Sequence, residues 1–141
     1  MSRIGPVAER PGVRTLLIVD DHAGFRSFAR ALLEADGYVV VGEAGDGASA
    51  VEAARRLSPE VVLLDIALPD EDGFAVCEQI ITGSDRASPE PSRRPAVVLT
   101  SSRDVASFRS RLRESCAVGF LAKRDLTGAA LAALVDGGPP A

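Results

Sequence analysis

Short apolar runs alternate along the chain with longer stretches in which apolar residues recur at helical spacing. Five runs are continuous and mostly β-branched, as strands buried on both faces of a sheet are: 16–19, 39–41, 61–64, 96–99 and 118–121. Each is followed by an amphipathic stretch with one apolar face: Phe25, Phe28 and Leu32; Val51, Ala54 and Leu57; Phe74, Cys77 and Ile81; Val105, Phe108 and Leu112; Leu126, Ala130 and Leu134. This alternation predicts an α/β fold of five βα units around a parallel sheet.

Polar residues mark where the predicted helices start and where the chain leaves the fold. Three acids are expected as N-caps: Asp46, Asp104 and Asp125. Three segments have few apolar residues. Residues 1–13 are predicted to be a flexible N-terminal extension, residues 82–95 an exposed loop, and residues 137–141 a tail or the start of a linker. The folded domain is therefore expected over residues 14–136.

Composition and charge narrow the class of protein. A chain of 141 residues with 46% hydrophobic content suits one domain with its own apolar core. The net charge of −4 gives no basic stripe, which argues against direct binding of nucleic acid by this domain. The apolar runs are far shorter than the ~20 residues of a membrane span. With no signal-peptide pattern at the start, we expect a cytoplasmic protein in which Cys77 and Cys116 are buried, free thiols.

Polar side chains follow four of the five predicted strands at the point where each strand ends. They are Asp20 and Asp21, then Asp65, then Thr100 with Ser101, and finally Lys123. Taken singly, each has a plain structural reading as a turn acid, a strand residue or a solvated cation. Together they stand at one edge of a parallel sheet, where ligands of such sheets bind.

The chemistry of this set points to a cation and to phosphorus. Two carboxylates about 4 Å apart repel by roughly 4 kcal/mol at an effective dielectric constant near 20, so positive charge must lie among them. Lys123 supplies one charge, and oxygen-only ligands favour a hard ion such as Mg²⁺ for the rest. A carboxylate beside such cations can attack phosphorus. The sequence therefore predicts phosphoryl transfer to an aspartate.

The motifs IVDDH, VVLLDIALPDEDG, VVLTSS and GFLAK resemble those of the receiver domain of bacterial two-component response regulators. The resemblance runs from Thr15 to about Val135. The forms DDH, GYVVVGEAGDG and KRD are most similar to receivers of LuxR/NarL-type regulators. The resemblance implies a flavodoxin-like (βα)5 three-layer sandwich, doubly wound, with strand order 2-1-3-4-5.

The same resemblance implies a role for each site residue. Asp65 would be the phosphoacceptor, and Asp21 with Asp65 would bind Mg²⁺, or Mn²⁺, directly. Asp20 would hold the ion through water, and Ala67 would add its backbone carbonyl. The phosphoryl oxygens would meet Thr100 and Lys123, and two residues would take part in the switch: Ser101 and Phe120. His22, beside the acid pair, is expected to have only a surface role.

The implied function is that of a signalling switch, which catalyses only its own phosphorylation and dephosphorylation. The phosphoryl donor would be a histidine kinase or a histidine phosphotransfer protein. The face made by the helix near Val105–Leu112, the strand at 118–121 and the last helix would change, and a homodimer would form through it on phosphorylation.

Three other readings stay open. One is the receiver fragment of a DNA-binding transcription regulator, and another is a receiver-like interaction module that is never phosphorylated. The third is a hydrolase of the haloacid-dehalogenase type, which needs a second acid two residues after the nucleophile, where Ala67 stands.

Overall fold

A five-stranded parallel sheet forms the centre of the computed structural model, which describes residues 14–87 and 94–137. The strands are β1 (Thr15–Val19), β2 (Val39–Ala44), β3 (Val61–Asp65), β4 (Ala96–Ser101) and β5 (Gly119–Ala122). Their order is β2-β1-β3-β4-β5, so the predicted topology is confirmed. All strands run the same way, and their carboxyl ends therefore lie at one edge.

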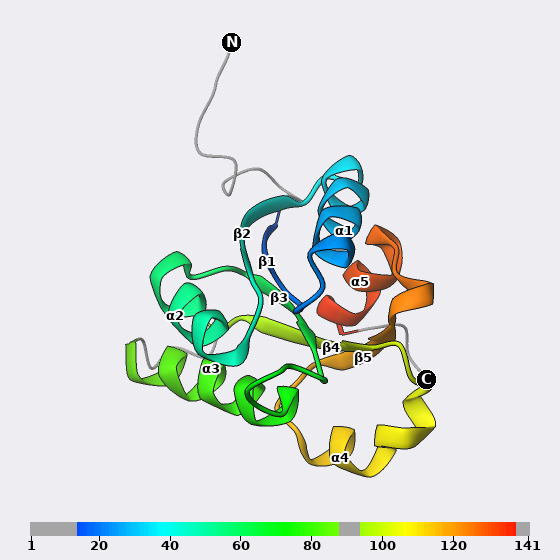
Figure 1. Ribbon diagram of the computed structural model, residues 1–141. Helices are drawn as coiled ribbons and strands as arrows, with labels where there is room; N and C mark the ends of the chain where they lie inside the picture. Colours follow the sequence, from blue (N-terminus) through cyan, green and yellow to red (C-terminus); the bar gives the residue numbers. More distant parts are fainter. Residues whose placement is uncertain (1–13, 88–93, 138–141) are drawn as a thin grey trace.

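Helices cover both faces of this sheet (Figure 1). They are α1 (Ala23–Ala35), α2 (Gly47–Leu57), α3 (Gly73–Ala87), α4 (Arg109–Glu114) and α5 (Gly128–Val135). Helices α1 and α5 pack on one face, whereas α2, α3 and the segment containing α4 pack on the other. The predicted three-layer sandwich is thus confirmed.

Successive strand residues alternate between the two layers of core. The layer under α1 and α5 contains Leu16, Ile18, Val61, Leu63 and Val98. The layer under α2 and α3 contains Leu17, Val19, Val62, Leu64, Val97 and Leu99. Because both rows are apolar, the strands read in the sequence as continuous apolar runs.

The structure differs from the prediction in one segment expected to be a helix and in one expected to be a loop. Residues Val105–Phe108 form a 3-10 turn, η3, and only the six residues of α4 after it are α-helical. Helix α3 extends to Ala87, so the predicted exposed loop over 82–95 is wrong for residues 82–87. The rest of that loop over 88–93, the extension 1–13 and residues 138–141 of the tail lie outside the described residues.

Of the three acids predicted to cap helix N-termini, only Asp46 does so with its side chain. Asp46 caps α2, where its carboxylate accepts a hydrogen bond of 2.8 Å from the Ser49 N–H. Asp104 precedes η3, but its carboxylate accepts from Arg124 instead. The Asp125 prediction is wrong, because Lys123–Asp125 form a second 3-10 turn, η4. Helix α5 is capped by Thr127, whose side chain accepts from the Ala130 N–H.

Four predictions of burial are also wrong. Two of them are Val105 and Val118, which are 41% and 46% exposed, because Val105 begins the short turn η3 and Val118 precedes β5. Phe28 is 56% exposed, because the inner stripe of α1 passes through Phe25, Ala29 and Leu33 at spacings of four residues. Cys116 is exposed, because it follows α4 instead of lying on an inner helix face. Cys77, in contrast, is fully buried as expected.

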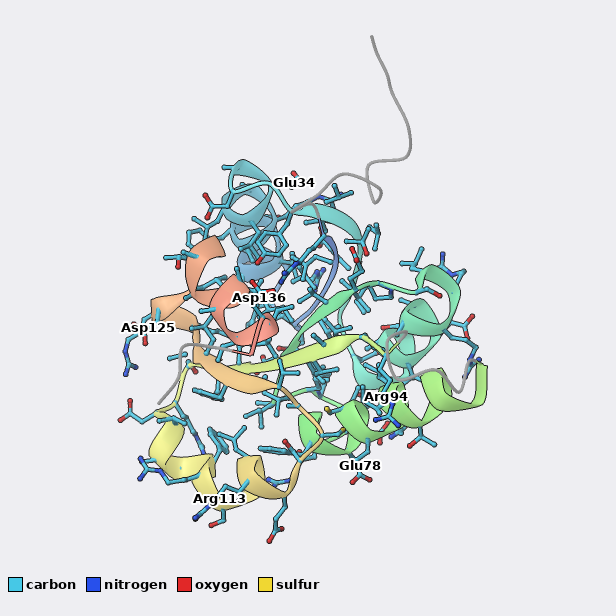
Figure 2. All side chains as sticks on the ribbon, turned by 180° about the vertical axis from the view of Figure 1, so that it is seen from behind. Glu34, Glu78, Arg94, Arg113, Asp125 and Asp136 are labelled. Carbon is cyan, nitrogen blue, oxygen red and sulfur yellow. The ribbon has the colours of Figure 1, made fainter. Side chains whose placement is uncertain are left out.

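Charged side chains lie around the periphery of the molecule (Figure 2), among them the exposed Glu34 on α1, Glu78 on α3 and Arg113 on α4. Within the described residues, no helix is both long enough and apolar enough to span a membrane.

Candidate functional site

Four polar side chains stand at the carboxyl ends of four strands, on one side of the sheet. Asp20, Asp65, Thr100 and Lys123 continue the alternate row that faces α1 and α5, in line with Ile18, Leu63, Val98 and Leu121. Asp65 and Thr100 are paired in register across β3 and β4. The exposed fractions of Asp20, Asp65 and Thr100 are 0%, 3% and 2%. Buried polar groups of this kind need partners in the fold or a ligand.

The ammonium group of Lys123 bridges the two buried acids. Its Nζ lies 2.5 Å from Asp20 Oδ2 and 3.3 Å from Asp65 Oδ2. It also lies 4.6 Å from the ring centroid of Phe25 on α1. The Lys123 side chain is 17% exposed, so this charge is placed in the interior of the site and is not a solvated surface cation.

Backbone groups fix the other oxygen of each acid. Asp65 Oδ1 accepts a hydrogen bond of 3.0 Å from the Ala67 N–H, and Asp20 Oδ1 accepts one of 2.8 Å from the His22 N–H. Arg26 donates to the main-chain oxygen of Asp20 at 2.7 Å. Both carboxylates are therefore oriented before any ligand arrives.

The pKa values of these groups show how the charges balance. Burial raises the pKa of Asp65, the Asp20 charge adds to this, and the Ala67 N–H and Lys123 offset it only in part. Burial also acts to raise the pKa of Asp20, but Lys123 and the His22 N–H outweigh it and lower that pKa. Burial acts to lower the pKa of Lys123, yet the two acids raise it, so the amine is protonated.

The donor atoms available for a cation are close together. Asp20, Asp21, His22 and Asp65 each offer one ligand atom, and these atoms all lie within 4.8 Å of one another. The Asp21 side chain is 33% exposed and opens the group to solvent. Carboxylate oxygens with access to water suit Mg²⁺, which keeps several of its waters when bound. The residues present therefore fit the predicted ion.

His22 lies closer to the acids than the sequence indicated. Its ring is exposed, but Nδ1 is 3.1 Å from Asp20 Oδ1 and 3.0 Å from Asp21 Oδ1. The predicted surface role thus misses a contact with both members of the acid pair. Its position directly after two acids was the signal that could have indicated it.

The hydroxyl of Thr100 is an unusual feature of the site. Its Oγ1 is buried and, among the described residues, has no hydrogen-bond partner. A buried polar atom left in this state costs about 1–3 kcal/mol. An oxygen-bearing ligand next to Asp65 would supply the missing partner.

The loop after β3 holds Asp65 in place through contacts that the sequence did not reveal. Asp70 accepts hydrogen bonds from the Gly47 and Ala48 N–H groups, at 2.7 Å and 3.1 Å, and so ties the loop to the start of α2. Gly73 packs so closely that a Cβ there would lie 2.6 Å from the Asp65 carbonyl oxygen and from Ile66 Cα. No side chain fits at this position.

The two residues predicted to take part in a switch face the other side of the sheet. Ser101 is buried, and its hydroxyl accepts a hydrogen bond from the Arg103 N–H. Phe120 is half-buried and packs against Phe108, with ring centroids 6.0 Å apart. Phe108 in turn packs against Phe74 at 6.3 Å. An aromatic row therefore joins β5 to the helix that follows the Asp65 loop.

Comparison with known proteins agrees with this geometry. A family model described as "Response regulator receiver domain" matches residues 16–135. The transcriptional regulatory protein PdtaR of Mycobacterium tuberculosis is 39% identical over 114 residues, which cover 78% of this chain and 49% of that protein. A putative transcriptional regulator of Pseudomonas aeruginosa is 36% identical over 110 residues with the same coverage. The chain thus spans about half the length of these curated relatives.

Among solved structures, the signal receiver domain of the putative response regulator NarL from Mycobacterium tuberculosis is 34% identical. It superposes with a TM-score of 0.70 over 90% of this chain and 99% of that one. The predicted likeness to receivers of NarL-type regulators is confirmed by this match.

Proposed function

Because the chain belongs to the response regulator receiver family, we propose that it accepts a phosphoryl group on Asp65 from a phosphohistidine. The donor is a histidine kinase or a histidine phosphotransfer protein. The proposal depends on the position of Lys123, 3.3 Å from Asp65 Oδ2, and on the buried hydroxyl of Thr100, which has no hydrogen-bond partner among the described residues. An ammonium and a hydroxyl next to a buried carboxylate suit the oxygens of an incoming phosphoryl group.

Asp20, Asp21 and Asp65 are the side chains that would hold Mg²⁺ or Mn²⁺, together with the backbone carbonyl of Ala67. When bound, the ion supplies positive charge that reduces the repulsion between Asp65 and the phosphoryl oxygens. Such charge would act on the carboxylate of Asp65, whose pKa is raised by burial and by Asp20.

The transfer itself is a displacement at phosphorus. A carboxylate oxygen of Asp65 attacks, a P–O bond forms, and the P–N bond to the donor imidazole breaks. The electron pair of that bond stays on the imidazole. Lys123 and Thr100 then contact the new phosphoryl oxygens, and charge-assisted hydrogen bonds of this kind contribute about 1.5–3 kcal/mol each. A shift from 1:99 to 99:1 between two states requires about 5.5 kcal/mol, so the two contacts supply much of it.

The switch follows from the chain connection between Thr100 and Ser101. As Thr100 closes on the phosphoryl group, the segment from Ser101 to Asp104 moves inward and Phe120 repacks with Phe108. Every residue of η3 and α4 is exposed or half-buried, so this segment can move at small cost in buried contacts.

The face that we expect to change comprises α4, β5 and α5, and a depression lined by Val105, Phe120 and Arg124 lies between η3, β5 and η4. A second copy of this chain is the partner that we assign to it. Since the two curated relatives described above bear the names of transcriptional regulators, the output class that we propose is control of transcription.

The test uses phosphoramidate, whose P–N bond is like that of phosphohistidine, together with Mg²⁺. We expect the intact mass to rise by about 80 Da, the mass of one added phosphoryl group. The gain should disappear in Asp65→Asn and on addition of EDTA. The variant Glu78→Gln, which changes an exposed acid on α3, should be phosphorylated like the wild type.

Two outcomes would contradict the proposal. Continuous release of phosphate without a stable adduct would favour the hydrolase. The absence of both an adduct and phosphate release, also with acetyl phosphate as donor, would favour the unphosphorylated interaction module.

A further inference from the structure

The two cysteines of the chain meet in space although 39 positions separate them. Cys77 lies in α3, and Cys116 lies in the segment between α4 and β5. Both are free thiols, and their Sγ atoms are 3.2 Å apart. Figures 1 and 2 both show this segment passing beside the first half of α3. A disulfide bond is about 2.05 Å long, so an approach of roughly 1.2 Å would bring the sulfur atoms to bonding distance.

The two thiols differ in their access to solvent. Cys77 is fully buried in the core layer under α2 and α3, whereas Cys116 is exposed. Burial, together with the hydrogen bond to Cys116, raises the pKa of the Cys77 thiol, which therefore remains protonated. A reagent in solution consequently meets Cys116 first, with Cys77 directly behind it.

The surroundings of Cys116 permit the approach. The Val118 N–H donates to the Val97 carbonyl at 2.8 Å and holds the chain after Cys116 to β4, whereas the Ala117 N–H makes only a local bond to the Ser115 hydroxyl. Helix α4, which comes just before, has only exposed and half-buried residues and can shift by an ångström with little loss of packing.

We propose that Cys77 and Cys116 form an oxidative modification site, at which a peroxide converts the two thiols into a disulfide that ties α3 to the α4–β5 segment. This site is separate from the acidic cluster and does not depend on the function proposed for Asp65.

The reaction balances with hydrogen peroxide as the oxidant. The Cys116 thiolate attacks one peroxide oxygen, an S–O bond forms, the O–O bond breaks, and the second oxygen leaves as water with the proton from Cys116. The Cys77 sulfur then attacks the Cys116 sulfur, an S–S bond forms and the S–O bond breaks. The hydroxyl leaves as water with the proton of Cys77. Two electrons pass from the sulfur pair to the peroxide, which gives two waters.

The disulfide would restrict the segment that carries α4. Its cross-link joins residues 39 positions apart, and a loop of this size lowers the conformational entropy of the unfolded chain considerably. We therefore expect the oxidised protein to melt several degrees higher than the reduced protein. Amide hydrogen exchange over residues 105–118 should slow in the oxidised form.

The experiment treats the reduced chain with stoichiometric hydrogen peroxide, followed by alkylation in denaturant and mass spectrometry. We expect a monomer about 2 Da lighter than the reduced protein, without alkylated cysteine, and a linked peptide pair containing Cys77 and Cys116. Dithiothreitol should restore two alkylated thiols. Cys116→Ser is the matched control, because an exposed side chain is replaced and the buried thiol is kept; it should show neither the mass loss nor the rise in melting temperature.

Three results would overturn the proposal. In the first, Cys77 is still alkylated after peroxide treatment while Cys116 carries a sulfinic acid. In the second, the product is a dimer of two chains joined through Cys116. In the third, the disulfide forms but neither the melting temperature nor hydrogen exchange over 105–118 changes, which would show that the bond does not restrain the segment that carries α4.

Discussion

Arg111 on α4 lies over the ring of Phe74 on α3, with its guanidinium carbon 4.2 Å from the ring centroid. The same guanidinium forms an ion pair with Asp72, in the loop that follows β3. One side chain thus fastens a lightly packed helix to the loop that holds Asp65. This contact would oppose the movement of α4 in the switch that we propose.

Replacing Arg111 by Ala should release α4. An exposed cation–π contact contributes about 0.5–1 kcal/mol and an exposed ion pair about 0.2–1 kcal/mol. A loss of about 1 kcal/mol from the resting state alone would shift the resting-to-active equilibrium about fivefold. We expect faster amide exchange over residues 105–114 and faster phosphorylation by phosphoramidate. Arg113→Ala, at an exposed position on the same helix, is the control. Equal effects of the two variants would show that the contacts of Arg111 with Phe74 and Asp72 do not restrain α4.

Asp70 gives the protein a stabilisation that depends on pH. The Gly47 N–H is the main reason why the pKa of Asp70 is lowered, with smaller help from Ala48. A lowered pKa in the folded state means that the stabilisation is present above the unfolded value of about 3.9 and is lost as the pH falls through the folded value. Asp70→Ala should therefore melt below the wild type at neutral pH.

The difference between the two melting temperatures should shrink as the solution is acidified. Melting curves recorded between neutral and strongly acidic pH measure it directly. Asp70→Asn, whose amide oxygen can still accept from the helix N-terminus, should fall between the two. A gap between wild type and Asp70→Ala that stays constant into strong acid would contradict this account.

Gly73 should tolerate no side chain. The Cβ of an alanine would lie 2.6 Å from backbone atoms of Asp65 and Ile66, which cannot rotate away as a flexible side chain would. Overpacking of this kind costs about 1–3 kcal/mol. We expect Gly73→Ala to be destabilised by this amount in urea unfolding and to be phosphorylated more slowly, since Asp65 is displaced.

The control lies on the same helix. A Cβ at Gly83 meets nothing within 4 Å among the described residues, and alanine favours the helix by about 0.5–1 kcal/mol relative to glycine. Gly83→Ala should thus be more stable than the wild type. If Gly73→Ala were as stable as Gly83→Ala, the close approach of the loop would be refuted.

Mg²⁺ should stabilise the folded protein through the acidic cluster. An ion that binds only the folded state at about one hundred times its Kd adds about 2.7 kcal/mol. Asp21→Asn changes an accessible ligand without disturbing the core, so its melting temperature in EDTA should match the wild type. We expect the Mg²⁺-induced rise to be lost in this variant and kept in Glu78→Gln. An equal rise in both variants would place the ion elsewhere.

The strands and the site could be predicted because the same feature of the sequence encodes both. Apolar runs buried on two faces define the strands, and the first polar residue after a run marks the sheet edge, as for Asp20, Asp65 and Lys123. Chain order alone does not give strand order, which came from the resemblance to receivers. The metal-binding and phosphoryl-binding roles of these residues stay predictions.

Other features could not be predicted, for physical reasons. The spacing of Val105, Phe108 and Leu112 is compatible with one helix, and also with a 3-10 turn that runs into a short helix. Residues 82–87 are polar and read as a loop, but helix α3 continues through them, because a helical backbone can extend past the last residue of its apolar face. The contacts of Arg111 with Phe74 and of Cys77 with Cys116 join distant parts of the chain, and no local periodicity encodes them.

Thr100 and Ser101 are consecutive residues of β4 whose side chains point to opposite sides of the sheet. The phosphorylation that we propose for Asp65 would take place on the α1 side of the sheet, whereas Phe120 and α4 lie on the other side. In the proposed switch, one peptide unit would therefore link the two sides of the sheet. The sheet separates the acidic cluster from the surface of α4, so residues on that surface can change in sequence while the acidic cluster stays the same.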